Sequence, residues 1–191
     1  MRFAFVVYDD LTLLDFSGIY DPITRLKSMG FIQDLEYDVC AFKETVRSFE
    51  GLEIRPNRVN NNLSEYDYVF LPGGNGIIPM LNDNEFLSWI GNVSSNTTMT
   101  AVCGGTLLLG AAGFLNGKRA TTHPMLMDFL NKYTDNVSDL RVVEDGNIIT
   151  ARGVTAAIDL GLYLCEKIAG IEVRKKIQKQ MDYLAYNGHM E

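Results

Sequence analysis

Cys103 lies in the segment TAVCGGTLLLGAAGF, between an apolar run that predicts a strand and a pattern that predicts a helix. A thiol on such a turn lies at a helix N-terminus, where the partial positive charge favours the nucleophilic thiolate. Gly104 and Gly105 suit a tight turn, and backbone N–H groups beside the sulfur can hold a developing negative charge. The alternative is that Cys103 is a small buried hydrophobic residue.

Few other residues could perform nucleophilic or imidazole chemistry. Cys40 falls in a predicted strand and Cys165 in an apolar helix, so we expect both to pack in the core. Three widely spaced cysteines without a CxxC pattern argue against a disulfide framework and a zinc site. We therefore expect no metal and no cofactor. Of the two histidines, His123 precedes a proline, and we expect His189 to be solvated.

The elements that must position Cys103 follow an alternating pattern. Apolar runs predict strands over residues 2–8, 36–42, 66–74 and 97–103, and Asp145-Gly146 predicts a hairpin over 141–151. Helical spacing predicts helices over 17–30, with Pro22 in the first turn, and over 84–93, 106–115, 155–170 and 172–186. Strands alternating with helices predict one α/β domain over residues 1–191, a three-layer sandwich with a mostly parallel sheet.

Three loops of this predicted sheet meet at one edge. They are the loop after the first strand, the Pro-Gly-Gly turn that ends the segment predicted over residues 66–74, and the turn at Cys103. Ligands bind at the carboxyl ends of the strands in such folds. We therefore expect the active site there.

Composition excludes several classes of function. The net charge of −7 argues against a nucleic-acid partner. No apolar run approaches the ~20 residues of a membrane-spanning helix, and the apolar stretch after Met1-Arg2 is too short for a signal peptide. We expect a cytoplasmic protein with a small-molecule substrate and no membrane partner.

The sequence resembles the ThiJ/PfpI superfamily, which is related to class I glutamine amidotransferases. Within it, the isonitrile hydratases and related amidase-like domains are the most similar branch. The resemblance runs from about residue 3 to residue 180 and implies a flavodoxin-like fold and a homodimer. Four segments carry it, in this order: LLDFSGIYD, VFLPGGNGI, AVCGGTLLLGAAGFLNGKRATTHP and ARGVTAAIDLGLYL.

The resemblance assigns roles to individual positions. Cys103 matches the nucleophile of the family, and Asp15 matches an acidic residue that approaches the thiol and transfers a proton. If a thiolate is close, this carboxyl must hold a proton, because two adjacent anions repel each other. From the sequence pattern alone, Asp15 could instead cap a helix that begins near Ser17.

The resemblance also implies roles for three further residues, each of which has a simpler structural explanation. Gly74 and Gly104 match backbone donors of the oxyanion pocket, although turn geometry alone would also explain both glycines. His123 matches a histidine near the nucleophile and could be a base or an orienting group. It could equally be a loop residue with an ordinary hydrogen bond. For Asp159, in an apolar helix, we expect capping or a bond to a neighbouring turn.

The chain departs from the family pattern at informative positions. Isonitrile-hydrating members usually carry threonine after the cysteine, and PfpI-type peptidases carry histidine there, whereas this chain has Gly104. The hydratase branch usually has tryptophan where this chain has Pro124. These departures leave the substrate open and disfavour peptidase activity.

Two classes of function follow. The first is an enzyme whose cysteine nucleophile attacks a small carbon–nitrogen or carbonyl substrate. The first candidate reaction is the hydration of an isonitrile to an N-substituted formamide. The others are an intracellular amidase-like activity and a glyoxalase-like activity on 2-oxoaldehydes. The second class is a non-catalytic redox or stress sensor, in which Cys103 is oxidised to a sulfinic acid.

Overall fold

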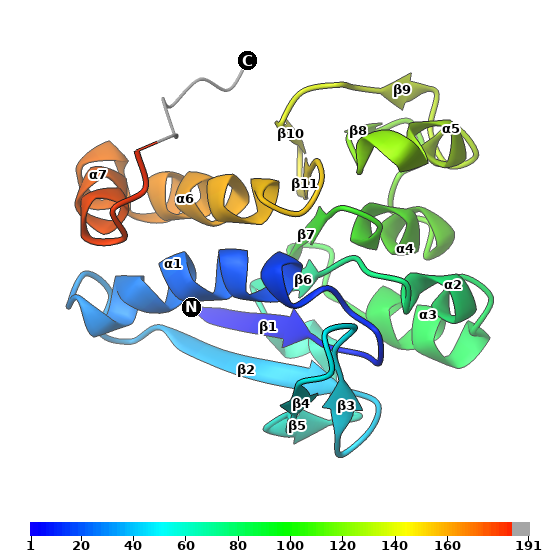
Figure 1. Cartoon of the computed structure of the whole chain (residues 1–191), viewed down its shortest axis with the longest axis horizontal. Coiled ribbons are helices and arrows are strands. Elements are labelled where there is room, and N and C mark those ends of the chain that lie inside the picture. Colours follow the sequence, from blue (N-terminus) through cyan, green and yellow to red (C-terminus); the bar gives the residue numbers. More distant parts are fainter. Residues whose placement is uncertain (185–191) are drawn as a thin grey trace.

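The structure, a computed structural model, describes residues 1–184. The strands of its central sheet are β1 (Arg2–Val6), β2 (Glu36–Ala41), β5 (Arg58–Val59), β6 (Tyr68–Leu71), β7 (Thr98–Val102), β10 (Val142–Asp145) and β11 (Ile148–Ala151). Their order across the sheet is β10-β11-β7-β6-β1-β2-β5 (Figure 1). Only β10 and β11 pair antiparallel, and the other neighbours are parallel. The predicted sandwich with a mostly parallel sheet is confirmed.

Side chains of β1 alternate between two separate halves of the core. Phe3 and Phe5 pack in one half, whereas Ala4 and Val6 pack in the other, and all four are fully buried. A strand covered on both faces reads as a continuous apolar run. This explains why β1, β6 and β7 were predicted from the sequence.

Helices cover the two faces of the sheet. On one face lie α1 (Leu13–Ser28) and α6 (Ala156–Ala169), side by side, with α7 (Ile171–Gln180) beside α6 (Figure 1). The other core half includes residues of α2 (Ile77–Met80), α3 (Asn84–Gly91), α4 (Gly105–Ala111) and α5 (Met127–Leu130). Each helix therefore buries its apolar side against one face.

The sequence did not predict several short elements. The strands β3 (Val46–Arg47) and β4 (Glu53–Ile54) pair antiparallel, and β8 (Arg119–Ala120) and β9 (Asn136–Val137) pair parallel, in two small extra sheets. Two-residue strands such as these and β5 are too short to show an alternating pattern. The single-turn helices α2 and α5 are likewise too short to show a helical period.

Three predicted helix bounds were wrong. Helix α4 ends at Ala111 rather than at residue 115. Helix α1 begins at Leu13 rather than near Ser17, so Pro22 lies inside the helix and not in its first turn. The last helix ends at Gln180 rather than at 186, because Asp182 adopts a left-handed conformation with φ 53°. The N–H groups of residues 182 and 183 then return to the carbonyls of residues 179 and 178, a Schellman-type end. His189 lies outside the described residues.

Helices α1 and α6 approach closely because each carries a glycine at the contact. A Cβ atom added at Gly18 would lie 2.7 Å from the Cβ of Ala157. One added at Gly161 would overlap the Pro22 ring and lie 3.2 Å from the Cα of Ile19. The contact therefore leaves no room for a side chain on either glycine.

We predict that Gly161→Val lowers the free energy of unfolding by about 1–3 kcal/mol, the usual cost of overpacking. Gly91→Val is the matched control, because Gly91 is also helical but has no atom within 4 Å of its would-be Cβ. Urea unfolding should show a change below about 0.5 kcal/mol for the control. Equal effects of the two substitutions would contradict the close contact.

Candidate active site

Cys103 lies on a strained turn between β7 and α4. Its φ of 57° is in the left-handed region, which non-glycine residues adopt rarely. Hydrogen bonds hold this conformation: the Cys103 N–H donates to the carbonyls of Ala151 (3.1 Å) and Arg152 (2.7 Å). The Thr122 hydroxyl donates to the Cys103 carbonyl at 2.6 Å. The predicted elbow is therefore present, and it turns the thiol out of the sheet.

Asp15 is the third residue of α1 and is fully buried. Its Oδ2 accepts the Gly73 N–H at 2.9 Å, while Oδ1 is buried and has no hydrogen-bond partner among residues 1–184. The N-cap residue of α1 is Thr12, so the alternative in which Asp15 caps this helix is wrong. The carboxyl is instead directed at the turns that surround Cys103.

Gly73 lies where these elements meet. A Cβ atom here would lie 2.6 Å from the Gly104 nitrogen, 2.8 Å from Asp15 Oδ2 and 2.8 Å from the Cys103 Cβ. The Pro-Gly-Gly turn, α1 and the cysteine elbow thus converge at one residue. Only glycine allows them to approach this closely.

Burial raises the pKa of both Asp15 and Cys103. Burial raises the pKa of Asp15 to about 6, against the Gly73 N–H and the Cys103 side chain, which both lower it. Burial also raises the pKa of Cys103 to about 12, and the Asp15 charge adds to this rise. Between these two values the pair holds a single proton, which belongs to the pair rather than to one residue.

Contrary to the expectation from the helix N-terminus, the pKa of the Cys103 thiol is raised overall. The N–H groups of Gly104 and Val154 do lower this pKa, but burial and the Asp15 charge outweigh them. Helix α4 is also short, with seven residues. Burial and the Asp15 charge therefore favour the protonated thiol.

Glu50 also acts on this site and was not predicted from the sequence. Its two carboxylate oxygens each lie 3.1 Å from the Leu13 nitrogen and accept its N–H at the start of α1. The negative charge of Glu50 contributes to the raised pKa of Asp15. No motif marks Glu50, because it reaches the site from a loop far along the chain.

A cavity of about 270 Å³ opens onto the thiol. Gly74, Gly104 and His123 line it together with Cys103, so the structure brings these predicted site residues together, with Asp15 buried behind the thiol. Much of the remaining wall is apolar, from Ile77, Ile78, Met125 and Leu126. Val154 also lines the cavity, and sequence reasoning missed it.

The two glycines of the wall are there for steric reasons. Gly74 has φ 112°, and a Cβ there would collide with the backbone of Asp10 and Thr12. At Gly104 a Cβ would lie 2.5 Å from Ile77 Cδ1. Ile77 thus fills the space into which a side chain at position 104 would extend.

His123 has a backbone role. Its Nδ1 accepts the Met125 N–H at 3.2 Å, and it caps the 3₁₀ turn Pro124–Leu126. A neutral imidazole that accepts at Nδ1 carries its proton on Nε2. The ring packs against Gly153, where a Cβ would lie 3.0 Å from Nε2.

The remaining singled-out residues are structural. Cys40 is buried 3.8 Å from the Tyr66 hydroxyl, and Cys165 is buried 3.3 Å from the Pro22 carbonyl, as expected for core residues. Asp159 is satisfied by an ion pair with Arg141 and by the Tyr183 hydroxyl at 3.0 Å, rather than by capping.

Within residues 1–184, no group of three or more His, Cys, Asp or Glu side chains could hold a metal ion. None of the described helices is long and apolar enough to cross a membrane.

Comparison with known proteins shows which family the chain belongs to. A family model described as the DJ-1/PfpI family matches residues 1–167. The chain belongs to this family. It is 33% identical over 184 residues to an isonitrile hydratase of Pseudomonas putida, an alignment that covers 96% of this chain and 78% of the relative.

Further relatives agree. The protein DJ-1alpha of Drosophila melanogaster is 35% identical over 179 residues, which cover 88% of this chain and 77% of the relative. A ThiJ/PfpI family protein from Pseudomonas syringae has a TM-score of 0.86 at 28% identity, covering 98% of this chain and 77% of the solved one. The flavodoxin-like fold follows from these likenesses.

We predict that limiting iodoacetamide labels Cys103 before Cys40 and Cys165, because Cys103 opens onto a cavity whereas the other two side chains are fully buried. Asp15→Asn removes the charge that raises the pKa of Cys103, so this pKa falls. The alkylation rate of Cys103 at pH 8 should then rise by about tenfold for each pKa unit lost.

Peptide mapping by mass spectrometry measures both effects. Asp21→Asn is the control, since Asp21 lies on the same helix and pairs with Arg25 on the surface. An even distribution of label over the three cysteines, or an unchanged rate in Asp15→Asn, would contradict the description of the pair.

Proposed function

We propose that this protein is an enzyme that hydrates a small isonitrile to an N-substituted formamide, with Cys103 as nucleophile and Asp15 as proton donor. One observation carries the proposal. The two side chains hold one proton between them beside a small, largely apolar cavity. Isonitrile hydration requires both a nucleophile and a proton at the same carbon atom.

The steps balance with these groups. The sulfur of Cys103 attacks the terminal carbon, which gains the proton that the pair holds, and a thioimidate forms. Water then adds to this carbon. Its oxygen becomes the formyl oxygen, one of its protons goes to nitrogen, and the other returns to the pair as the C–S bond breaks. Isonitrile and water are consumed, and the resting enzyme is restored.

Burial suits this chemistry. A protonated thiol and a carboxyl with a pKa near neutrality favour proton transfer in step with attack, rather than attack by a free thiolate. The N–H groups of Gly104 and Val154, which face the sulfur, would stabilise negative charge that develops there. The apolar wall at Ile77, Ile78 and Leu126 would take the hydrocarbon substituent.

The other candidate reactions would use the same pair. An amide or a 2-oxoaldehyde would present a carbonyl carbon to Cys103. A redox sensor would instead be oxidised fastest as a thiolate, and the raised pKa of Cys103 works against that form. The similarity to an isonitrile hydratase supports the first choice.

We predict turnover of a small alkyl isonitrile in a panel that also contains small amides and methylglyoxal. Asp15→Asn should reduce kcat by about 10²–10⁴-fold, the usual worth of general acid–base catalysis. This loss should occur although Cys103 remains alkylatable and the fold remains intact. Chromatographic detection of the formamide measures the rate, and Asp21→Asn should keep it.

The other outcomes separate the alternatives. Near-normal turnover by Asp15→Asn would contradict the acid role. Turnover of methylglyoxal alone would favour the glyoxalase-like reaction. Stoichiometric oxidation of Cys103 by peroxide, without turnover of any panel member, would favour the sensor.

We also propose a homodimer that covers the neighbourhood of the cavity. Ile78 and Met125, on its wall, are 65% and 81% exposed, and Phe129 nearby in the chain is 51% exposed. Large exposed apolar side chains close together often mark a protein interface. Light scattering at micromolar concentration should give twice the monomer mass, and a monomer would contradict the proposal.

A further inference from the structure

Tyr8 and Asp15 contact the same peptide group from opposite sides. This group joins Pro72 to Gly73 in the Pro-Gly-Gly turn. Its carbonyl, on Pro72, accepts a hydrogen bond from the Tyr8 hydroxyl, and its N–H, on Gly73, donates to Asp15 Oδ2 at 2.9 Å. The peptide bonds of residues 1–184 are all trans, so the carbonyl and the N–H of this group point in opposite directions. The turn therefore lies between the phenol and the carboxyl.

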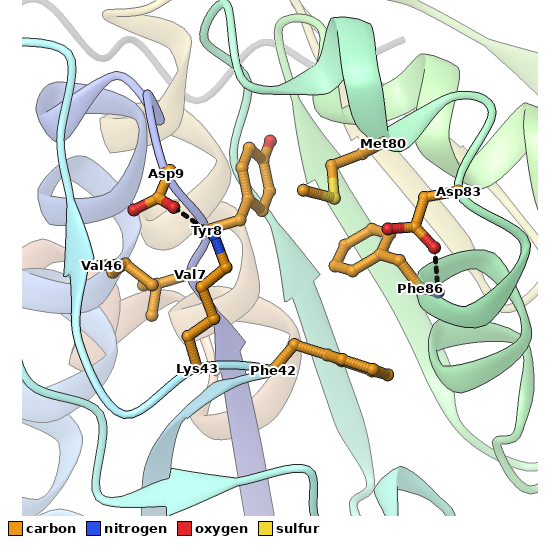
Figure 2. Close-up of a pocket in the computed structure, with 9 residues that line it drawn as sticks. All are labelled: Val7, Tyr8, Asp9, Phe42, Lys43, Val46, Met80, Asp83 and Phe86. Atoms are coloured by element: carbon orange, nitrogen blue, oxygen red, sulfur yellow. Dashed lines mark hydrogen bonds and ion pairs between the residues drawn. The ribbon is translucent and has the colours of Figure 1, made fainter.

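Packing fixes the position of Tyr8. The residue is 4% exposed, and its ring meets the Phe86 ring edge to face, with centroids 5.9 Å apart at 82°. Its hydroxyl is directed away from Phe42 (Figure 2). Burial raises the pKa of Tyr8 well above its usual value, and the charges of Asp15 and Cys103 add to this rise. The hydroxyl therefore keeps its proton and remains a donor.

The loop between β1 and α1 holds the Pro-Gly-Gly turn at further points. The Thr12 N–H donates to the Gly73 carbonyl at 3.1 Å, and the Gly76 N–H donates to the Asp10 carbonyl at 3.2 Å. These main-chain contacts fix the turn as a whole. Among the contacts, that of the Tyr8 hydroxyl on the Pro72 carbonyl falls on the peptide that reaches Asp15.

A peptide group transmits a change at one end to the other. A hydrogen bond accepted by the carbonyl draws electron density to the oxygen and makes the N–H a stronger donor, by about 10–30% for each bond in a chain. The Gly73 N–H stabilises the carboxylate form of Asp15 and lowers its pKa. Loss of the phenol would weaken this N–H as a donor and would free the peptide to turn away from Asp15.

Other groups near Asp15 change its pKa without acting through this peptide. The Cys103 side chain lowers this pKa, and the negative charge of Glu50, from the loop between β3 and β4, raises it. Where α6 packs against α1, the residue in contact is Ala157, which carries no charge. An effect of Tyr8 on Asp15 can therefore be separated from these by changing the phenol alone.

We propose that Tyr8 is a positioning residue for the acid. Through the peptide of Pro72 and Gly73, its hydroxyl holds the Asp15 carboxyl in place and sets how strongly that carboxyl holds a proton. This inference rests on the proposed function only in that Asp15 is the proton donor there. Tyr8 is not among the residues that line the cavity at Cys103, so it acts on the reaction through Asp15 rather than through the substrate.

The test is the titration of Asp15 in the full chain, followed by carbon-13 NMR of the side-chain carboxyl groups, with Asp15→Asn used to assign the signal. Tyr8→Phe removes only the hydroxyl. It should raise the pKa of Asp15 by about 0.5–2 units, the upper value being the loss of a whole hydrogen bond to a charged group. The Gly73 amide proton should shift upfield.

The same variant has a kinetic readout. The pair at Cys103 holds a single proton only above the pKa of Asp15. If that pKa rises, the acid limb of the pH profile of kcat/KM for isonitrile hydration should move to higher pH by the same amount.

Two controls separate this effect from a general loss of stability. Tyr20→Phe removes the same atom from the helix that carries Asp15, at a ring that packs 5.0 Å from the Phe5 ring. Ile177→Val shortens a fully buried side chain on α7 and lowers stability without touching the turn. Neither substitution should change the pKa of Asp15.

A second variant should give the opposite sign. Replacing Tyr8 by 3-fluorotyrosine keeps the hydroxyl and makes it a stronger donor, so the pKa of Asp15 should fall. This variant decides the question if Tyr8→Phe does not fold. The proposal is overturned by an unchanged pKa of Asp15 in folded Tyr8→Phe, or by an unchanged or raised pKa in the fluorinated protein. Because the titration needs no substrate, a failure to turn over isonitriles would contradict the proposed function and leave this result intact.

Discussion

A buried carboxyl and a buried thiol cannot both lose their protons at neutral pH, and the architecture around Cys103 follows from this constraint. If the two groups lay further apart, Asp15 would hold its proton alone, because an isolated buried anion is costly. If a positive charge lay between them, both would ionise and the shared proton would be lost. The single N–H of Gly73 on Asp15 is enough to orient the carboxyl without removing its affinity for a proton.

The packing of two helices therefore controls the distance between Asp15 and the Cys103 thiol. Helix α1 carries Asp15, and it is held against α6 by the contacts at Gly18 and Gly161. The chain just before α6 supplies the Val154 N–H that faces the sulfur. A change in the spacing of α1 and α6 would move the acid and one of the backbone donors relative to the thiol. Gly18 and Gly161, although far from the thiol, thus help to set the positions of the groups that surround it.

Elements that leave a recognisable local pattern could be predicted from the sequence. The strands buried on both faces, the Asp145-Gly146 hairpin and the elbow at Cys103 each leave a local signature, and all are present in the structure. Two-residue strands leave none. The start of α1 was missed because Glu50, from a distant loop, receives the first N–H of the helix.

The pKa of Cys103 could not be predicted from the elbow alone. The local pattern suggests a helix N-terminus and hence a thiolate, but the pKa depends on how deeply the thiol is buried and on which charge faces it. Those depend on residues near 15, 73 and 154, which come together only in the folded chain. Long-range assembly reverses the sign of the local expectation.

The contact between Gly104 and Ile77 has a consequence for how this site can diverge. A larger residue at position 104 collides with Ile77 Cδ1, whereas a smaller residue at position 77 merely opens space. The two positions are in contact, so their substitutions should not act additively. A hydroxyl-bearing residue beside the nucleophile therefore requires the end of the Ile77 side chain to move to another rotamer or to be shortened. Varying positions 104 and 77 together therefore samples cavity shapes that varying position 104 alone leaves out.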